Sequence, residues 1–147
     1  MSQETKRINI FPFTTSFFKN TSDFEYYFRD WLLDNLTVEH TQLRKPDFMV
    51  FAYQGDHSLW GYAEIESWKD PHEHEADDGI EWGGGKFRRL YKVKPCSLKE
   101  FKKHVPYVFL LDIGFDTSSI VYAPQISMEI FNQVLRKAEG EINRCTR

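Results

Sequence analysis

Three carboxylates interrupt two otherwise apolar segments of the chain, and acidic side chains in such positions are candidates for holding a metal ion. Asp47 lies in Pro46-Asp47-Phe48-Met49-Val50-Phe51, and Glu64 and Glu66 lie in Gly61-Tyr62-Ala63-Glu64-Ile65-Glu66. An ionised carboxylate is costly to remove from water, so a cation or a strong donor is expected to face an apolar strand that keeps one. Residues two apart on a strand share a face, so Glu64 and Glu66 point the same way. If the two segments form neighbouring strands, Asp47 approaches Glu64, and the carboxylates suit Mg²⁺ or Mn²⁺, which prefer oxygen ligands.

The elements that would position these carboxylates follow an α/β pattern. Ser22-Asp23-Phe24-Glu25 has the spacing of a helix capping box, and apolar residues at intervals of three and four predict a helix to about Leu36. The next predicted elements are strands at 37–43, 47–53 and 59–68, an irregular segment at 70–95, a helix at 97–104, strands at 105–111 and 120–123, and a final amphipathic helix around Ile130 to Ala138. This order predicts that residues 1–147 form a single domain, an α/β sandwich in which helices flank a central mixed β-sheet.

The two carboxylate segments carry a family resemblance. With Pro46-Asp47 opening one strand and Glu64-Ile65-Glu66 on the next, the chain resembles the PD-(D/E)xK nuclease superfamily over roughly residues 22–123. The resemblance implies an αβββαβ-type core like those of restriction endonucleases and Holliday-junction resolvases. It also implies a metal-dependent endonuclease that hydrolyses phosphodiester bonds of DNA, with Mg²⁺ or Mn²⁺ as cofactor. Asp47 and Glu64 would be metal ligands, and Glu25 on the first helix would be an auxiliary acid.

Glu66 departs from the superfamily pattern, which usually has a lysine at this position. On the resemblance, Glu66 either binds the metal or acts as the base. A catalytic lysine would then come from the strand end, where Lys69 lies, or from Lys86 in the glycine-rich segment. The departure also supports an alternative function, a catalytically inactive nuclease-like module that binds nucleic acid or a protein. A plainer alternative makes Asp47 a turn residue and places the two glutamates on a solvated strand face.

Charges are segregated along the sequence, although the formal net charge is only −3. Residues 64–81 contain eight acidic residues and one lysine, whereas residues 86–103 contain eight basic residues and one glutamate. Because basic residues attract phosphates, Lys86, Arg88, Arg89 and Lys92 are candidates for binding nucleic acid. The resemblance favours DNA over RNA and is compatible with a homodimer. The alternative is that the two charged segments form solvated surfaces that neutralise each other.

Three further features are candidates for chemistry. His72 and His74 stand among acidic residues and either bind zinc or another transition metal or belong to a solvated loop. Gly83-Gly84-Gly85-Lys86 lacks the Ser or Thr of a Walker loop, so the glycines either let basic residues reach a phosphate backbone or form a linker. His40 is either an accessory ligand or a structural strand residue.

Composition sets the remaining expectations. The 147 residues, 41% of them apolar, suffice for a core. Cys96 and Cys145 are too few and too far apart in sequence for a disulfide framework or a cysteine-rich zinc site, so a reducing compartment is expected. Residues 1–9 lack an apolar stretch of signal-peptide length, and no segment reaches the roughly 18 apolar residues of a membrane span. We expect a soluble cytoplasmic protein with no membrane partner.

Overall fold

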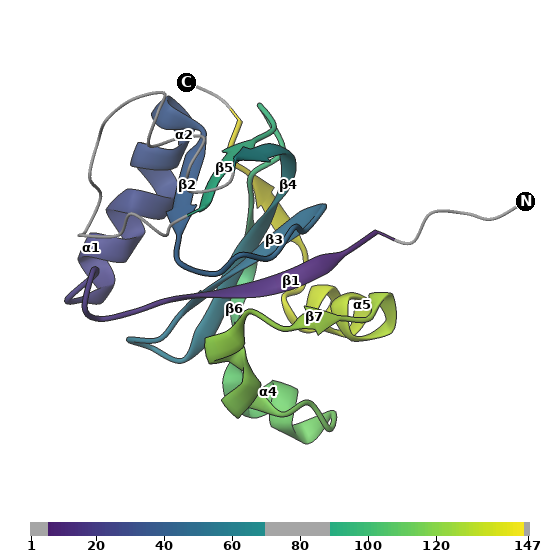
Figure 1. Cartoon of the computed structure of the whole chain (residues 1–147). Helices are drawn as coiled ribbons and strands as arrows, with labels where there is room; N and C mark the ends of the chain where they lie inside the picture. The colour runs from purple at the N-terminus through teal and green to yellow at the C-terminus, as the bar shows by residue number, and fades with distance from the viewer. Residues whose placement is uncertain (1–5, 70–88, 146–147) are drawn as a thin grey trace, which may run out of the picture.

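The computed structural model describes residues 6–69 and 89–145, and a mixed β-sheet lies at the centre of this part of the chain (Figure 1). Its eight described strands are β1 (Ile8–Phe13), β2 (Thr37–His40), β3 (Phe48–Tyr53), β4 (Ser58–Lys69), β5 (Arg89–Val93), β6 (Lys99–Pro106), β7 (Gln125–Ile126) and β8 (Glu141–Asn143). The strand order is β2-β5-β4-β3-β1-β7, and β6 pairs with both β4 and β8. Strand β1 is parallel to β3, whereas the other paired strands are antiparallel. The predicted mixed sheet is confirmed.

The sheet separates two apolar clusters, and helices cover both. A helix from Thr21 to Asn35 covers the first cluster and consists of α1 (Thr21–Tyr26), the π-helical turn η1 (Tyr27–Trp31) and α2 (Leu32–Asn35). The second cluster is covered by α4 (Tyr107–Asp112), the 3₁₀ helix η2 (Thr117–Tyr122) and α5 (Met128–Lys137). Figure 1 shows α1 and α2 on one side of the sheet and α4 and α5 on the other. The described helices are all too short or too polar to cross a bilayer.

Strand β4 contains a β-bulge at Trp60. Phe51 pairs with Gly61 while Ala52 pairs with Leu59, so Trp60 is an extra residue on β4. An extra residue reverses the alternation of side chains along a strand, and Trp60 therefore packs in the first cluster together with Ala63, three residues further along β4. Gly61 is required here, because a Cβ atom would lie 2.0 Å from the backbone carbonyl oxygen of Lys99.

The first half of the chain follows the sequence prediction closely. The predicted helix at 22–36 is confirmed, although its N-cap is Asn20, whose side chain accepts a hydrogen bond of 2.9 Å from the Asp23 backbone N–H. The strands predicted at 47–53 and 59–68 are present as β3 and β4, and the predicted final helix is α5. Strands β1 and β5 were not predicted, because an aromatic lead-in and a glycine-rich segment hide their patterns.

Between residues 97 and 123 the prediction is wrong. The predicted helix at 97–104 is strand β6, the predicted strand at 105–111 is helix α4, and residues 120–123 belong mostly to the 3₁₀ helix η2. Pairing of β6 with both β4 and β8 outweighs the local capping-box spacing, because tertiary contacts override helix propensity. The αβββαβ-type core is therefore incorrect, and the predicted sandwich is confirmed only as a mixed sheet with a few covering helices.

Candidate functional site

The three carboxylates of the predicted metal site bind protein groups instead of converging. The Asp47 carboxylate accepts a hydrogen bond of 2.8 Å from the Arg7 backbone N–H. Glu64 pairs with Lys94 at 3.7 Å, and Glu66 pairs with Lys92 at 3.6 Å. Within residues 6–69 and 89–145, no group of three or more His, Cys, Asp or Glu side chains is arranged to hold a metal ion. The described structure therefore does not assemble Asp47, Glu64 and Glu66 into a shared metal site.

Two glutamate–lysine pairs join the described end of the acidic segment to the basic segment. Antiparallel pairing of β4 with β5 brings the acidic strand against the basic one, so charges far apart in sequence meet across the ladder. All four side chains are between 40% and 58% exposed, and such surface pairs contribute little to stability. This arrangement agrees with the alternative of mutually neutralising surfaces, and Lys92 already has Glu66 as its partner.

The other predicted catalytic residues lie elsewhere. Lys69 ends β4 opposite Leu90, five residues from Glu64, which corresponds to about 16 Å along a strand. Glu25 forms an ion pair with Arg29, one turn further along its helix. His40 donates from Nε2 to the Pro12 carbonyl oxygen at 2.5 Å and accepts at Nδ1 from the Gln42 N–H at 3.1 Å, so both nitrogens are occupied by the backbone.

Several nucleic-acid and metal candidates fall outside the described residues, namely Lys86, Arg88, His72, His74 and the Gly83–Lys86 loop. Arg89 is described, but only 5% of its surface is exposed. It therefore has little surface to offer a phosphate backbone.

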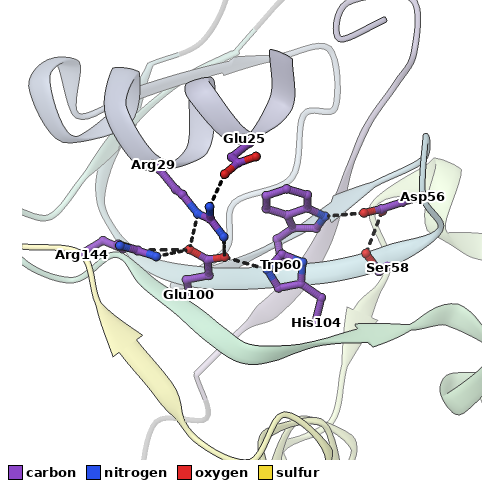
Figure 2. A network of polar contacts seen from close by, with 8 residues as sticks. All are labelled: Glu25, Arg29, Asp56, Ser58, Trp60, Glu100, His104 and Arg144. Carbon is purple, nitrogen blue, oxygen red and sulfur yellow. Dashed lines mark hydrogen bonds and ion pairs between the residues drawn. The ribbon is translucent and has the colours of Figure 1, made fainter. Parts of the chain in front are cut away.

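A buried carboxylate at Glu100 organises a polar network of hydrogen bonds and ion pairs (Figure 2). Arg29 reaches both oxygens of Glu100, donating from Nε to Oε1 at 2.8 Å and from Nη2 to Oε2 at 2.7 Å. Arg144 donates from Nε and Nη2 to Oε1 at 3.1 and 2.7 Å, and His104 Nε2 lies 2.7 Å from Oε2. The carboxylate thus connects the π-helical turn, β6 and the C-terminal segment.

Glu100 stays ionised although only 1% of its surface is exposed. Burial alone raises the pKa of a carboxyl group, but hydrogen bonds from His104, Arg29 and Arg144 lower the pKa of Glu100 to about 2. Trp60 closes the network, with its ring 4.2 Å from that of His104 and its Nε1–H donating to Asp56 at 3.1 Å. The polar groups of the network bind one another, so we assign it a structural role.

Cys96 and Cys145 form a disulfide, although their separation in sequence did not suggest one. The bond joins the turn between β5 and β6 to the segment after β8, across 49 residues of sequence. Arg144 immediately precedes Cys145, so the disulfide also holds this arginine near Glu100. The expectation of a reducing compartment rested on the lack of a disulfide framework, and the disulfide removes this support.

A cavity of about 680 Å³ opens beside the helix that covers the first cluster, and aromatic side chains dominate its wall. The wall is formed by the segment between β1 and α1, by the helix itself, by β2 and by the segments next to them. Its aromatic residues are Phe13, Phe17, Phe18, Tyr26, Tyr27 and Trp31. Phe17 is 50% exposed and Tyr26 is 61% exposed. Large exposed rings at a concave site are typical of ligand pockets, and we refer to this cavity as the aromatic pocket.

The π-helical turn shapes the aromatic pocket. Tyr27 and Trp31 lie four residues apart, and their rings stack with centroids 5.5 Å apart and planes 20° apart. Phe18 packs on Tyr27 with a centroid distance of 4.9 Å, which fixes the preceding segment against the helix. The pocket therefore has a preformed aromatic floor, and π-helical turns occur frequently at functional sites.

The sequence analysis placed Tyr27 and Trp31 on the apolar face of the helix and missed the pocket. Tyr27 and Trp31 fit the apolar face of the helix, so their periodicity indicates only burial. Tyr26 lies off that face, and this exposed aromatic residue is the one local signal that indicates binding.

Comparison with known proteins identifies the fold. The chain matches no protein-family model, and no curated protein matches its sequence. The crystal structure of ASCH from Zymomonas mobilis superposes with a TM-score of 0.55 at 10% identity, covering 88% of this chain and 94% of that one. A serine-to-alanine mutant of the Zymomonas mobilis protein gives a TM-score of 0.56 at 9% identity, covering 92% of this chain and 99% of that one. The chain has an ASCH-like fold. The PD-(D/E)xK resemblance is therefore wrong, and with it the predicted metal-dependent DNA endonuclease.

Proposed function

We propose that this ASCH-like chain is a nucleic-acid-binding module that holds an unstacked base of single-stranded RNA in the aromatic pocket. The fold supports this by analogy, because ASCH domains are of the PUA-like type associated with RNA binding. The proposal keeps the binding-module alternative and replaces DNA with RNA as the expected partner.

The aromatic pocket is the observation that carries the proposal. Sequence-specific RNA recognition targets single-stranded bases that stack on aromatic side chains, and Phe17 and Tyr26 offer exposed rings for this purpose. Stacking of one base on an aromatic residue contributes about 1–3 kcal/mol. Backbone and side-chain polar groups of the wall, such as Gln54 and Thr41, can then bind the edge of the base.

Two basic residues are close in sequence to residues that line the pocket. Lys19 directly follows Phe18, and Arg44 is two residues beyond Gln42, which lines the wall. Both side chains are exposed, so they can contact phosphates on either side of a bound base. This gives the module a salt-dependent component of affinity.

Fluorescence anisotropy with short single-stranded RNA tests the proposal. Tyr26→Ala is expected to weaken binding about tenfold, because it removes one stacking surface. Tyr122→Ala is the matched control, since Tyr122 is 67% exposed and lies outside the pocket wall. Single-stranded and duplex DNA of the same sequence serve as competitors.

Two outcomes would contradict the proposal. Equal affinity of the Tyr26→Ala and Tyr122→Ala variants for RNA would show that the pocket does not bind the base. Duplex DNA competing as well as single-stranded RNA would show that binding depends on charge alone.

A further inference from the structure

Asp23 and Tyr26 are neighbours on α1, and both line the aromatic pocket. Both side chains are exposed, and the Tyr26 ring retains 61% of its accessible surface. Residues three apart on a helix have their Cβ atoms about 5–6 Å from each other. A base that stacks on the Tyr26 ring therefore has the Asp23 carboxylate beside its edge.

The fold fixes the backbone of Asp23 on both sides. Its N–H donates a hydrogen bond of 2.9 Å to the Asn20 side chain, which caps the helix. The next residue, Phe24, is fully buried, and its ring stacks on that of Tyr53 with centroids 4.7 Å apart. Within the described part of the chain the Asp23 carboxylate itself has no hydrogen-bond or ion-pair partner. Its oxygens are thus held at the pocket and can accept hydrogen bonds from a ligand.

A carboxylate distinguishes the four RNA bases by their Watson–Crick edges, which are accessible in single-stranded RNA. An ionised carboxylate only accepts hydrogen bonds, and it offers two oxygens side by side. Guanine presents two adjacent donors, N1–H and the 2-amino group, and can bind both oxygens at once. Adenine, cytosine and uracil place an acceptor next to their donor, so one carboxylate oxygen would face another acceptor. Guanine is therefore the base that this carboxylate suits best.

We infer that Asp23 makes the aromatic pocket selective for guanine. This inference rests on the proposed function and specifies the base that the same site binds. Tyr26 supplies the stacking surface, and Asp23 accepts hydrogen bonds from N1–H and from the 2-amino group of the stacked base. Hydrogen bonds to a charged group are stronger than those between neutral groups, and a pair of them fixes the orientation of the base.

Calorimetric titration of the full chain with single-stranded RNA pentanucleotides tests the inference. The oligonucleotides are uridine sequences that differ only in the central base, which is guanine, hypoxanthine, adenine or cytosine. Hypoxanthine is guanine without the 2-amino group, so it retains the stacking and loses one hydrogen bond to the carboxylate. The guanine oligonucleotide is expected to bind about tenfold more tightly than each of the other three.

Asp23→Asn isolates the contribution of the carboxylate. The substitution keeps the size of the side chain and the backbone N–H that bonds to Asn20, so the helix cap is retained. The preference for guanine over hypoxanthine should fall at least threefold, because an amide has one uncharged acceptor oxygen in place of two charged ones. Asp112→Asn is the matched control, an exposed acid on α4 outside the pocket wall, and should leave the preference unchanged.

The possible failures can be told apart. Equal affinity for guanine and hypoxanthine, or an undiminished preference in the Asp23→Asn protein, overturns the inference. The proposed function still stands in that case if Tyr26→Ala weakens RNA binding. If no oligonucleotide binds, the proposed function fails as well. Tighter binding of N-acetylarginine amide than of the guanine oligonucleotide would also overturn the inference, because the carboxylate would then recognise the guanidinium group of a protein.

Discussion

Glu100 carries a negative charge inside the protein because Arg29, Arg144 and His104 direct N–H groups at its two oxygens. Replacing the carboxylate leaves two arginines without their buried counter-ion, which typically costs about 3–5 kcal/mol. Because these partners come from three distant parts of the chain, the residue couples the covering helix to the C-terminal segment.

Low pH should reduce the free energy of unfolding, because Glu100 becomes protonated. The network lowers the pKa of Glu100 from 4.5 to about 2, so its contribution is complete above the unfolded-state value and is lost as the pH falls toward 2. Between pH 5 and pH 2 the free energy of unfolding should fall about 3 kcal/mol further for the natural protein than for Glu100→Gln. Urea unfolding at several pH values measures this, and parallel pH profiles would show that Glu100 titrates normally.

At the scale of elements, two local irregularities position the functional groups. The π-helical turn carries Tyr27 and Trp31 to the pocket and Arg29 to the network. The β-bulge turns Trp60 toward the same helix, where its ring lies 5.9 Å from the Arg29 guanidinium. Both irregularities therefore place side chains that a regular helix or strand would direct elsewhere.

A substitution at Gly61 tests the structure of β4 at the bulge. Gly61→Ala should lower the free energy of unfolding by about 3 kcal/mol or more, because the added methyl group meets the Lys99 carbonyl oxygen and the Phe28 ring. Ala63→Gly, two residues along β4, is a control that adds no atoms. Thermal or urea unfolding measures both variants, and a Gly61→Ala protein as stable as the control would contradict the close approach of β4 and β6.

The elements could be predicted from the sequence wherever their pattern is local. The helix around Phe24 and Phe28 repeats every three or four residues, and β3 is a short apolar run between turns. Residues 97–104 could not be predicted in this way, because Glu100 occupies a capping-box position yet belongs to a strand whose partners are distant in sequence.

The candidate site could be predicted from the sequence even less well than the fold. Glu64 and Glu66 resembled a metal site because their lysine partners lie on β5 and directly after it, and the glycine-rich segment conceals this strand. The aromatic pocket draws on residues as far apart as Phe17 and Val121 and has no linear motif. Only the fold brings these residues together.

At the scale of the whole molecule, the Cys96–Cys145 disulfide fixes the end of the described chain against the sheet. Cys145→Ser should lower the free energy of unfolding by about 2–4 kcal/mol, since the bond closes a long loop. Combined with Arg144→Ala, the effect should be less than additive, because both changes release the same segment. Urea unfolding without reductant measures this, and a reductant that leaves the stability of the natural protein unchanged would contradict it.

Photo-crosslinking shows directly whether the aromatic pocket holds a base of bound RNA. Single-stranded RNA containing 5-iodouridine is irradiated with the full chain, and the attached residues are identified by mass spectrometry. Crosslinks are expected at the aromatic residues of the pocket, chiefly Tyr26 and Phe17, and should be lost when unlabelled RNA competes. Crosslinks confined to the β4–β5 surface around Lys92 and Lys94 would contradict it, because RNA would then bind the paired charges and leave the pocket empty.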